Sequence, residues 1–409
     1  MDVNPMLKPN SVAFTVLLAG LAAMAPISTD IALPSYDATA AALGVTQAAV
    51  AVNLSLFMMG YALGPLVYGP LSERFGRRPV LIVGLALYVV AGAICFVTPS
   101  LAGLLVGRLI QGIAAASASV LSLAMVRDLY EGDEARRKLS YVMLILGLMP
   151  MVAPTIGAAV LVAFGWRSVY AAMAVAGLIL FAGVVFGVGE TIRARNPDAL
   201  VPRHLLASYR EVVSHPTGFG YSMLGALCFG IMFSFIAGSS MLFMGVLGVS
   251  AGTYGYLFAI PVLGMMAGTI LNARLSGKGI GDIRIMTAGL AIVSVAVTLL
   301  VIVIAMGSTS VPLVVGLLLA NNFGIGLVIP NTSHRALQPM PHLAGIASAV
   351  LNSAQMAAGA LASALVAALV PFLGASATTL GMAVFAVAAC CLFVLLTRLE
   401  AGRTVQLAG

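Results

Sequence analysis

The sequence predicts an all-α integral membrane protein with twelve transmembrane helices. Of its 409 residues, 61% are hydrophobic and only 8% are charged, whereas soluble domains carry about 25% charged residues. Apolar runs of roughly 20 residues, the length that crosses a bilayer as a helix, recur from one end of the chain to the other. The predicted spans are 11–35, 47–71, 79–98, 101–127, 139–163, 167–188, 217–246, 251–274, 284–306, 311–333, 343–369 and 373–397.

The basic residues support both the number of spans and their orientation. With twelve spans, 18 of the 20 Lys and Arg residues fall at the N-terminus, in the connections that follow even-numbered spans, or at the C-terminus; the exceptions are Arg108 and Arg167. Because cytoplasmic connections are enriched in Lys and Arg, both termini are predicted to be cytoplasmic. The net charge of +7 therefore reflects membrane topology, and we do not expect a nucleic-acid partner.

One long polar connection divides the chain. Residues 190–216 are expected to form a cytoplasmic linker between two six-helix bundles, 1–189 and 217–409. The connection Leu275–Arg284, L-S-G-K-G-I-G-D-I-R, resembles Leu71–Arg78, L-S-E-R-F-G-R-R, and each joins the second and third spans of its half. Repeated halves with the site at their interface are a common transporter plan. The sequence thus predicts two pseudo-symmetric bundles.

The residue types inside the spans argue against catalysis. The four cysteines all lie within spans, and neither C-x-x-C nor a Cys/His cluster is present, so no metal site or cofactor is expected. An intramembrane enzyme needs a nucleophile with a base, or metal ligands, and the spans offer a single deep carboxylate, Asp30. We therefore predict that the protein is not an enzyme. A receptor that binds its ligand without moving it remains an alternative.

Asp30 lies in the first span, in I-S-T-D-I-A-L-P. An ionised side chain within a membrane costs about 3 kcal/mol or more, and normally faces a cavity or a partner. Asp30 lies about 7 Å below the outer end of its span, and Arg108 of the fourth span about 10 Å, at 1.5 Å per residue. We predict that the two form a pair, with Gln111, one turn from Arg108, orienting the guanidinium. The alternative is that each side chain reaches the interface separately.

A carboxylate near a guanidinium can couple transport to protons. Its affinity for a proton depends on burial and on nearby charge, while arginine does not titrate in proteins. Movement of Arg108 or water relative to Asp30 would therefore load or release one proton. We expect protons, the lipid bilayer and a small, largely apolar substrate as partners, a proton gradient as the energy source, and a monomer.

Polar, aromatic and methionine side chains inside the spans are candidates for substrate binding. These are Asn53, Tyr61, Gln111, Met149, Met232, Phe235, Asn321, Asn352 and Gln355. The amides could equally form interhelical hydrogen bonds, and the methionines could serve only in packing. In the fifth span, Pro150 and Pro154 remove backbone donors close to Gly157, which predicts a bent or weakened helix.

Several motifs together resemble a known family. The stretch Gly69–Pro79, G-P-L-S-E-R-F-G-R-R-P, resembles the inner-loop signature of the major facilitator superfamily. The D-I-x-L-P of the first span, R-x-x-Q-G and the terminal R-D of the fourth, the Pro/Gly run of the fifth and the outer G-W-R resemble the bicyclomycin and chloramphenicol resistance branch of drug:proton antiporters. The motifs match the family specifically in the first half of the chain. The second half matches it mainly in the arrangement of the predicted spans.

This resemblance implies the major facilitator fold and roles for individual residues. Asp30 takes the proton-coupling position and Arg108 that of the intramembrane arginine. A conformational latch is implied for Gly69, Glu73, Arg74, Gly76, Arg77, Arg78 and Asp128, and an antiporter-type bend for Pro150, Pro154 and Gly157. The chain departs from the pattern in having Glu73 where aspartate is usual, Pro65 where glutamine is frequent, and Ala153 and Ala158 in place of glycines.

The expected function is a proton-coupled multidrug or antibiotic exporter that works by alternating access in a bacterial inner membrane. The alternative is an exporter, symporter or uniporter of a small metabolite or nutrient with the same fold. A sugar transporter would need more acidic and hydrogen-bonding groups in the first, fourth, seventh and tenth spans, where they are scarce.

Overall fold

The computed structural model describes residues 7–9, 11–192, 194–307 and 309–408, which contain helices and no strand. Within these ranges, twelve helical segments are long and apolar enough to cross a membrane, as predicted. The all-α membrane architecture is therefore confirmed, whereas the cytoplasmic placement of both termini stays a prediction.

The chain divides into two compact units, Met1–Leu205 and Leu206–Gly409, and the division falls within the segment 190–216. The first unit contains α1 (Val12–Asp30), η1 (Leu33–Ser35), α2 (Tyr36–Leu43), α3 (Gln47–Phe75), α4 (Arg77–Val97), α5 (Leu101–Leu129), α6 (Gly132–Phe164), α7 (Trp166–Gly187) and η2 (Pro197–Leu200). Helix α8 (Pro202–Ser214) contains the boundary.

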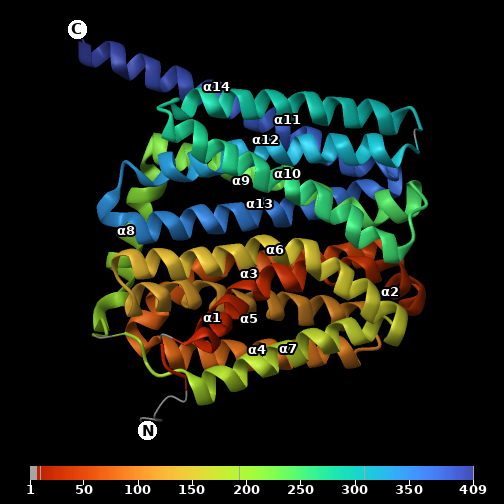
Figure 1. Ribbon diagram of the computed structural model, residues 1–409, viewed down its shortest axis with the longest axis horizontal. Coiled ribbons are helices and arrows are strands. Elements are labelled where there is room, and N and C mark those ends of the chain that lie inside the picture. The colour runs from red at the N-terminus through yellow and green to blue at the C-terminus, as the bar shows by residue number, and fades with distance from the viewer. Residues whose placement is uncertain (1–6, 10, 193, 308, 409) are drawn as a thin grey trace. The chain divides into compact units, whose positions relative to one another are not determined.

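The second unit contains the rest of the helices. They are α9 (Pro216–Ser240), the π-helical η3 (Met241–Val246), α10 (Ala251–Gly277), α11 (Asp282–Ala305), α12 (Val311–Leu337), η4 (Pro341–Leu343), α13 (Ala344–Leu373) and α14 (Ser376–Ala408). Within each unit most of the long helices lie side by side along one direction (Figure 1).

The chain remains helical beyond the predicted end of the first span. Residues Tyr36–Leu43 form α2, where the sequence analysis placed a short outer segment. Its sequence, Y-D-A-T-A-A-A-L, is rich in alanine, the strongest helix former. The helix ends at Gly44, whose φ of 65° is left-handed and favours glycine.

Close packing in the first unit brings α3 and α5 together. A Cβ built on Gly112 of α5 would lie 2.0 Å from the carbonyl oxygen of Phe57 on α3, so only glycine permits this approach. The contact places Asn53 and Arg108 on neighbouring helices. Helix α1 packs against α5 and α6, which brings the end of α1 beside the same region.

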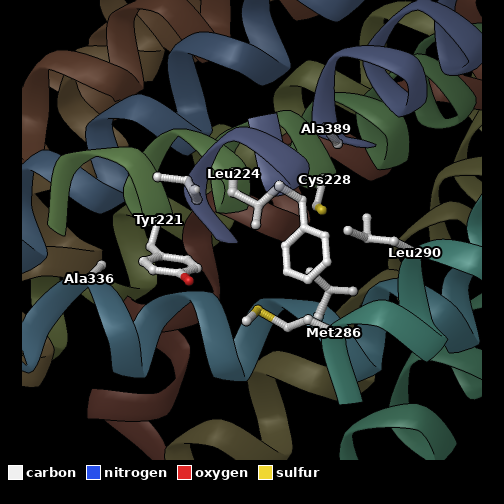
Figure 2. Packing of buried hydrophobic residues seen from close by; sticks show 10 residues of the cluster. Tyr221, Leu224, Cys228, Met286, Leu290, Ala336 and Ala389 are labelled. Carbon is white, nitrogen blue, oxygen red and sulfur yellow. The ribbon is translucent and has the colours of Figure 1, made fainter. Parts of the chain in front are cut away.

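In the second unit, α12 packs against α9, α10 and α11, and α9 packs against α13 and α14. A hydrophobic cluster contributed by α9, α11, α12 and α14 forms part of its core (Figure 2). Its members include Leu224, Cys228, Met286 and Leu290, each at most 4% exposed. This apolar packing fixes the helices that carry the polar residues described below.

Candidate functional site in the first unit

Arg108 is fully buried in α5, and neutral groups hold its guanidinium. Its Nε donates to Asn53 Oδ1 at 2.5 Å, Nη1 to Gln111 Oε1 at 2.7 Å, and Nη2 to the carbonyl oxygen of Ser28 at 2.9 Å. The guanidinium carbon also lies 4.3 Å from the ring centroid of Phe57, a favourable cation–π position. The guanidinium is therefore bound by dipoles and a π-face.

These partners are themselves held in place. Asn53 donates through Nδ2 to the hydroxyl of Tyr170 at 2.7 Å, and Ser28 Oγ lies 2.6 Å from the hydroxyl of Tyr88. The network joins α1, α3, α4, α5 and α7. Tyr36 is also buried, and its hydroxyl makes no hydrogen bond within the described part of the chain.

Asp30, the last residue of α1, is 3% exposed. Its Oδ1 accepts a hydrogen bond from Thr29 Oγ1 at 3.0 Å, and Thr29 Oγ1 also lies 2.9 Å from the carbonyl oxygen of Pro26. Across the described ranges, its carboxyl group has no further hydrogen bond and no ion pair within 4.0 Å. Asp30 is thus a buried acid with a single hydroxyl partner.

The predicted direct pair between Asp30 and Arg108 is wrong for this conformation. Arg108 donates to the backbone of Ser28, two residues before Asp30, and its Nε and Nη1 donate to the side-chain amides of Asn53 and Gln111. The sequence analysis matched the charges by depth; its prediction that Gln111 orients the guanidinium is confirmed, but it missed the other neutral groups that contact the guanidinium. These missed partners, direct and indirect, are Ser28, Phe57, Met173, Tyr88 and Tyr170. The presence of tyrosines within apolar spans was the sequence feature that could have indicated these partners.

Gly157 allows α6 to contact α1 directly beside Asp30. A Cβ built on Gly157 would lie 2.0 Å from the carbonyl oxygen of Ile31, the residue that follows Asp30. Helix α6 runs from Gly132 to Phe164 through Pro150 and Pro154 without interruption, so the predicted weakening does not break the helix. Gly157 therefore sets the distance between α6 and the segment that carries the carboxyl group.

Replacing Gly157 by Ala is expected to reduce transport strongly and to lower the thermal unfolding midpoint, because a backbone oxygen occupies the space that the methyl group needs. Gly147→Ala on the same helix is the matched control, since nothing lies within 4 Å of its built Cβ. The control should transport normally and gain up to about 1 kcal/mol of helix stability. Equal transport by the two variants would contradict this role for Gly157.

A charged cluster lies where α3, α4, α5 and α7 end or begin. Arg77 Nε is 3.0 Å from Asp128 Oδ2, and Arg77 Nη1 donates to Ser72 Oγ at 2.6 Å. The sequence analysis did not identify Glu190, whose Oε1 accepts from the backbone nitrogens of Arg77 and Thr191 at 2.9 Å. Glu190 thus caps the start of α4, where an acidic group is favoured.

The other predicted latch residues surround this cluster. Gly76 has a φ of 102°, and its built Cβ would lie 2.3 Å from Glu190 Oε2. Arg78 Nη2 donates to the carbonyl oxygen of Val185, and Arg74 lies over the ring of Phe75. The carbonyl oxygen of Gly69 accepts from Ser72.

Glu73 was predicted to belong to the charged latch, but its carboxylate does not take part in the charged cluster. Its backbone carbonyl accepts from Asn196, but its carboxylate has no hydrogen bond or ion pair among the described residues. The reason is that Asp128 and Glu190 already supply the acidic groups around Arg77.

Asp128→Asn is expected to lower the free energy of unfolding by about 1–3 kcal/mol, because Arg77 and Thr191 then lose a charged acceptor. Glu73→Gln should change it by less than about 0.5 kcal/mol. Thermal unfolding of the two purified variants measures the difference. A larger loss for Glu73→Gln would restore Glu73 to the network.

A family model described as Major Facilitator Superfamily matches residues 16–363. The chain belongs to the Major Facilitator Superfamily. It is therefore a transporter and not an enzyme, and a multi-pass membrane protein.

Two relatives named for drug resistance are similar to most of the chain. The bicyclomycin resistance protein homolog of Haemophilus influenzae is 28% identical over 357 residues, 87% of this chain and 88% of that protein. The multidrug resistance protein D of Escherichia coli is 29% identical over 362 residues, 88% of this chain and 89% of that protein.

Solved superfamily structures share the fold at low identity. A bacterial homolog of the human lysosomal transporter Spinster, in an inward-facing and occupied conformation, has a TM-score of 0.71 at 15% identity over 96% of this chain and 97% of that chain. A D-xylose-proton symporter has a TM-score of 0.71 at 17% identity over 93% and 97%. At these identities the likeness supports the fold alone.

The second unit of this superfamily member carries a charge cluster that the sequence analysis missed. Arg335 Nη1 lies 2.7 Å from Glu400 Oε1, and Arg335 Nε lies 3.5 Å from Asp282 Oδ2. Asp282 is the first residue of α11, as Arg77 is the first of α4. In the first unit the arginine begins one helix and its acidic partner lies near the end of the next. In the second unit the aspartate begins the corresponding helix, and the arginine lies near the end of the next. The repeat of the inner connections was the available signal.

The candidate substrate residues occupy different environments. Asn53 and Gln111 hold Arg108, and Tyr61 stacks with Phe57 at 6.4 Å between ring centroids. Met149 and Met232 are half-buried, and Asn352 is exposed and donates to the carbonyl oxygen of Ser348 on its own helix. The other three candidates, Phe235, Asn321 and Gln355, are buried in the second unit. Substrate binding by this set stays a prediction.

Proposed function

We propose that the chain is a proton-coupled exporter of small, largely apolar compounds, including antibiotics, in a bacterial inner membrane. Its relatives named for bicyclomycin and multidrug resistance support drug export. Asp30 is the observation that carries proton coupling, because it is a buried acid whose hydroxyl partner, Thr29, suits both of its protonation states. The protein would work by alternating access, as a monomer and without a cofactor.

The hydroxyl of Thr29 accounts for the two states. A hydroxyl has one proton to donate and lone pairs to accept with. When Asp30 is ionised, Thr29 donates to the carboxylate across 3.0 Å. When Asp30 is protonated, the acid donates to Thr29, which then donates to the carbonyl oxygen of Pro26 across 2.9 Å. The carboxyl group therefore stays hydrogen-bonded to Thr29 in both states, whereas the bond from Thr29 to the carbonyl oxygen of Pro26 forms only in the protonated state.

Arg108 supplies the charge that senses this exchange. Its guanidinium is fixed by Asn53, Gln111 and the backbone of Ser28. Ionised Asp30 is attracted to this fixed charge through a medium of low dielectric constant, and protonated Asp30 is not. Proton binding thereby changes the force between α1 and α5, and this change would favour one conformation of the transport cycle.

One titrating carboxyl group limits the exchange to one proton per cycle at this site. Exchange of a neutral solute for one proton moves one net charge. A membrane potential of about 100 mV then supplies about 2.3 kcal/mol, which supports a concentration ratio of about fiftyfold.

The test begins with a growth panel in an efflux-deficient bacterial host, which identifies a compound that the protein protects against. The same compound is then presented to proteoliposomes under an imposed pH gradient. An antiporter concentrates substrate on the acidic side, whichever way the protein is inserted. Accumulation on the alkaline side would identify a symporter, and equilibration without accumulation a uniporter; either result would overturn the proposal.

A further inference from the structure

Asn321 of α12 has an unusual environment for a buried amide. Its side chain is fully buried, and neither Nδ2 nor Oδ1 makes a hydrogen bond within the described part of the chain. Its neighbour Asn322 donates to the carbonyl oxygen of Leu318, and Asn331 donates to Asn272. Since buried polar groups normally have partners, the amide of Asn321 lacks one that another state of the protein must supply.

The position of Asn321 on α12 shows what surrounds it. Asn321 and Thr332 are eleven residues apart, which is close to three helical turns, so they lie on one face. That face meets α9, because the Oγ1 of Thr332 lies 2.9 Å from a Cβ built on Gly225, and the backbone of Ala336 lies near Gly218. The pairings show that α9 and α12 are antiparallel. Asn321 therefore faces α9 near the level of Phe235.

Aromatic rings gather at this level. Phe235 stacks with Phe258 of α10 at 5.5 Å between ring centroids, and Phe243 and Tyr254 meet the same group edge-on or tilted. Such rings favour flat, apolar molecules through burial and stacking. The carboxamide of Asn321 offers one donor and one acceptor on the same edge.

We propose that Asn321 is a specificity-determining residue that binds the cis-amide edge of a neutral, largely apolar substrate, as found in lactams, imides and hydantoins. In such groups an N–H and a C=O lie side by side, so they match the carboxamide with two hydrogen bonds. Because Asn321 is fully buried in the described conformation, the proposal requires a substrate-binding conformation that exposes it. This inference rests on the proposed export function and names the substrate class for it.

The test uses purified protein in lipid nanodiscs with two probes, 5,5-diphenylhydantoin and its N,N-dimethyl derivative, which differ in their N–H donors. The wild type is expected to bind the hydantoin at least about tenfold more tightly, since each hydrogen bond contributes modestly and an unmet partner costs more. Asn321→Leu should bind both probes equally, and Asn322→Leu, the matched control, should keep the preference. Wild-type protein that binds neither probe, or both equally, overturns the inference.

Stability gives a second readout. If the amide has no partner in the resting state, Asn321→Leu should unfold at or above the wild-type temperature, because an unsatisfied polar group is replaced by an apolar one of similar size. A clear drop in the midpoint would mean that the amide has a structural partner, and the inference would fail. Export of compounds without an amide by the wild type, measured in the growth panel, tests the proposed function separately from this inference.

Discussion

Replacing Asp30 by Asn is expected to abolish accumulation of substrate against its gradient while exchange of labelled for unlabelled substrate continues. Asparagine has the shape of the protonated acid but cannot bind or release a proton. The variant therefore keeps only the steps in which substrate crosses the membrane without proton transfer. Accumulation in proteoliposomes under the imposed pH gradient should fall to a ratio of one. Substrate binding should remain measurable, because the carboxamide can still accept from Thr29.

Two further measurements separate this outcome from simple misfolding. The carboxamide in Asp30→Asn carries no charge, so the variant should unfold at a temperature no lower than the wild type, as burial of an ionised group is costly. Asp37→Asn is the matched control, since Asp37 is an exposed carboxylate on α2, and it should accumulate substrate normally. Full gradient-driven accumulation by Asp30→Asn would end the assignment of Asp30 as the proton site.

The number of spans could be predicted because a bilayer leaves few alternatives to the helix. Each span needs about 20 apolar residues, and the charges between spans record the alternation of sides. The sequence did not show where α2 begins, because its alanine-rich segment has no periodic apolar signal. It follows that hydropathy predicts the membrane-spanning architecture better than the connections.

The charged residues of the site could be predicted from the sequence, but the groups that bind them could not. Asp30 and Arg108 stand out because ionisable residues are rare in spans, and their depths follow from helix rise. Rotation about each helix axis does not follow from depth, so the neutral acceptors Asn53 and Ser28 were not assigned to Arg108. The same holds for Glu190, which lies 113 residues from Arg77 in the chain and beside it in the fold.

Arg108→Ala is expected to be more damaging than Asp30→Asn and to reduce both folding and transport. Three buried acceptors, Asn53 Oδ1, Gln111 Oε1 and the carbonyl oxygen of Ser28, lose their donor at once. Each unsatisfied group costs about 1–3 kcal/mol, so the loss is a large part of the stability of an ordinary domain, about 5–15 kcal/mol.

Arg108→Lys separates the charge of this residue from its shape. Lysine keeps the positive charge but cannot reproduce the planar fork that reaches three acceptors. We expect an unfolding midpoint between those of the wild type and Arg108→Ala, with measurable but weakened proton-driven accumulation. Arg167→Ala serves as control, because Arg167 contacts the ring of Trp166 and the carbonyl oxygen of Thr98 away from this network. If Arg108→Ala folds and accumulates substrate as well as Arg167→Ala does, the guanidinium neither supports the network nor acts on Asp30.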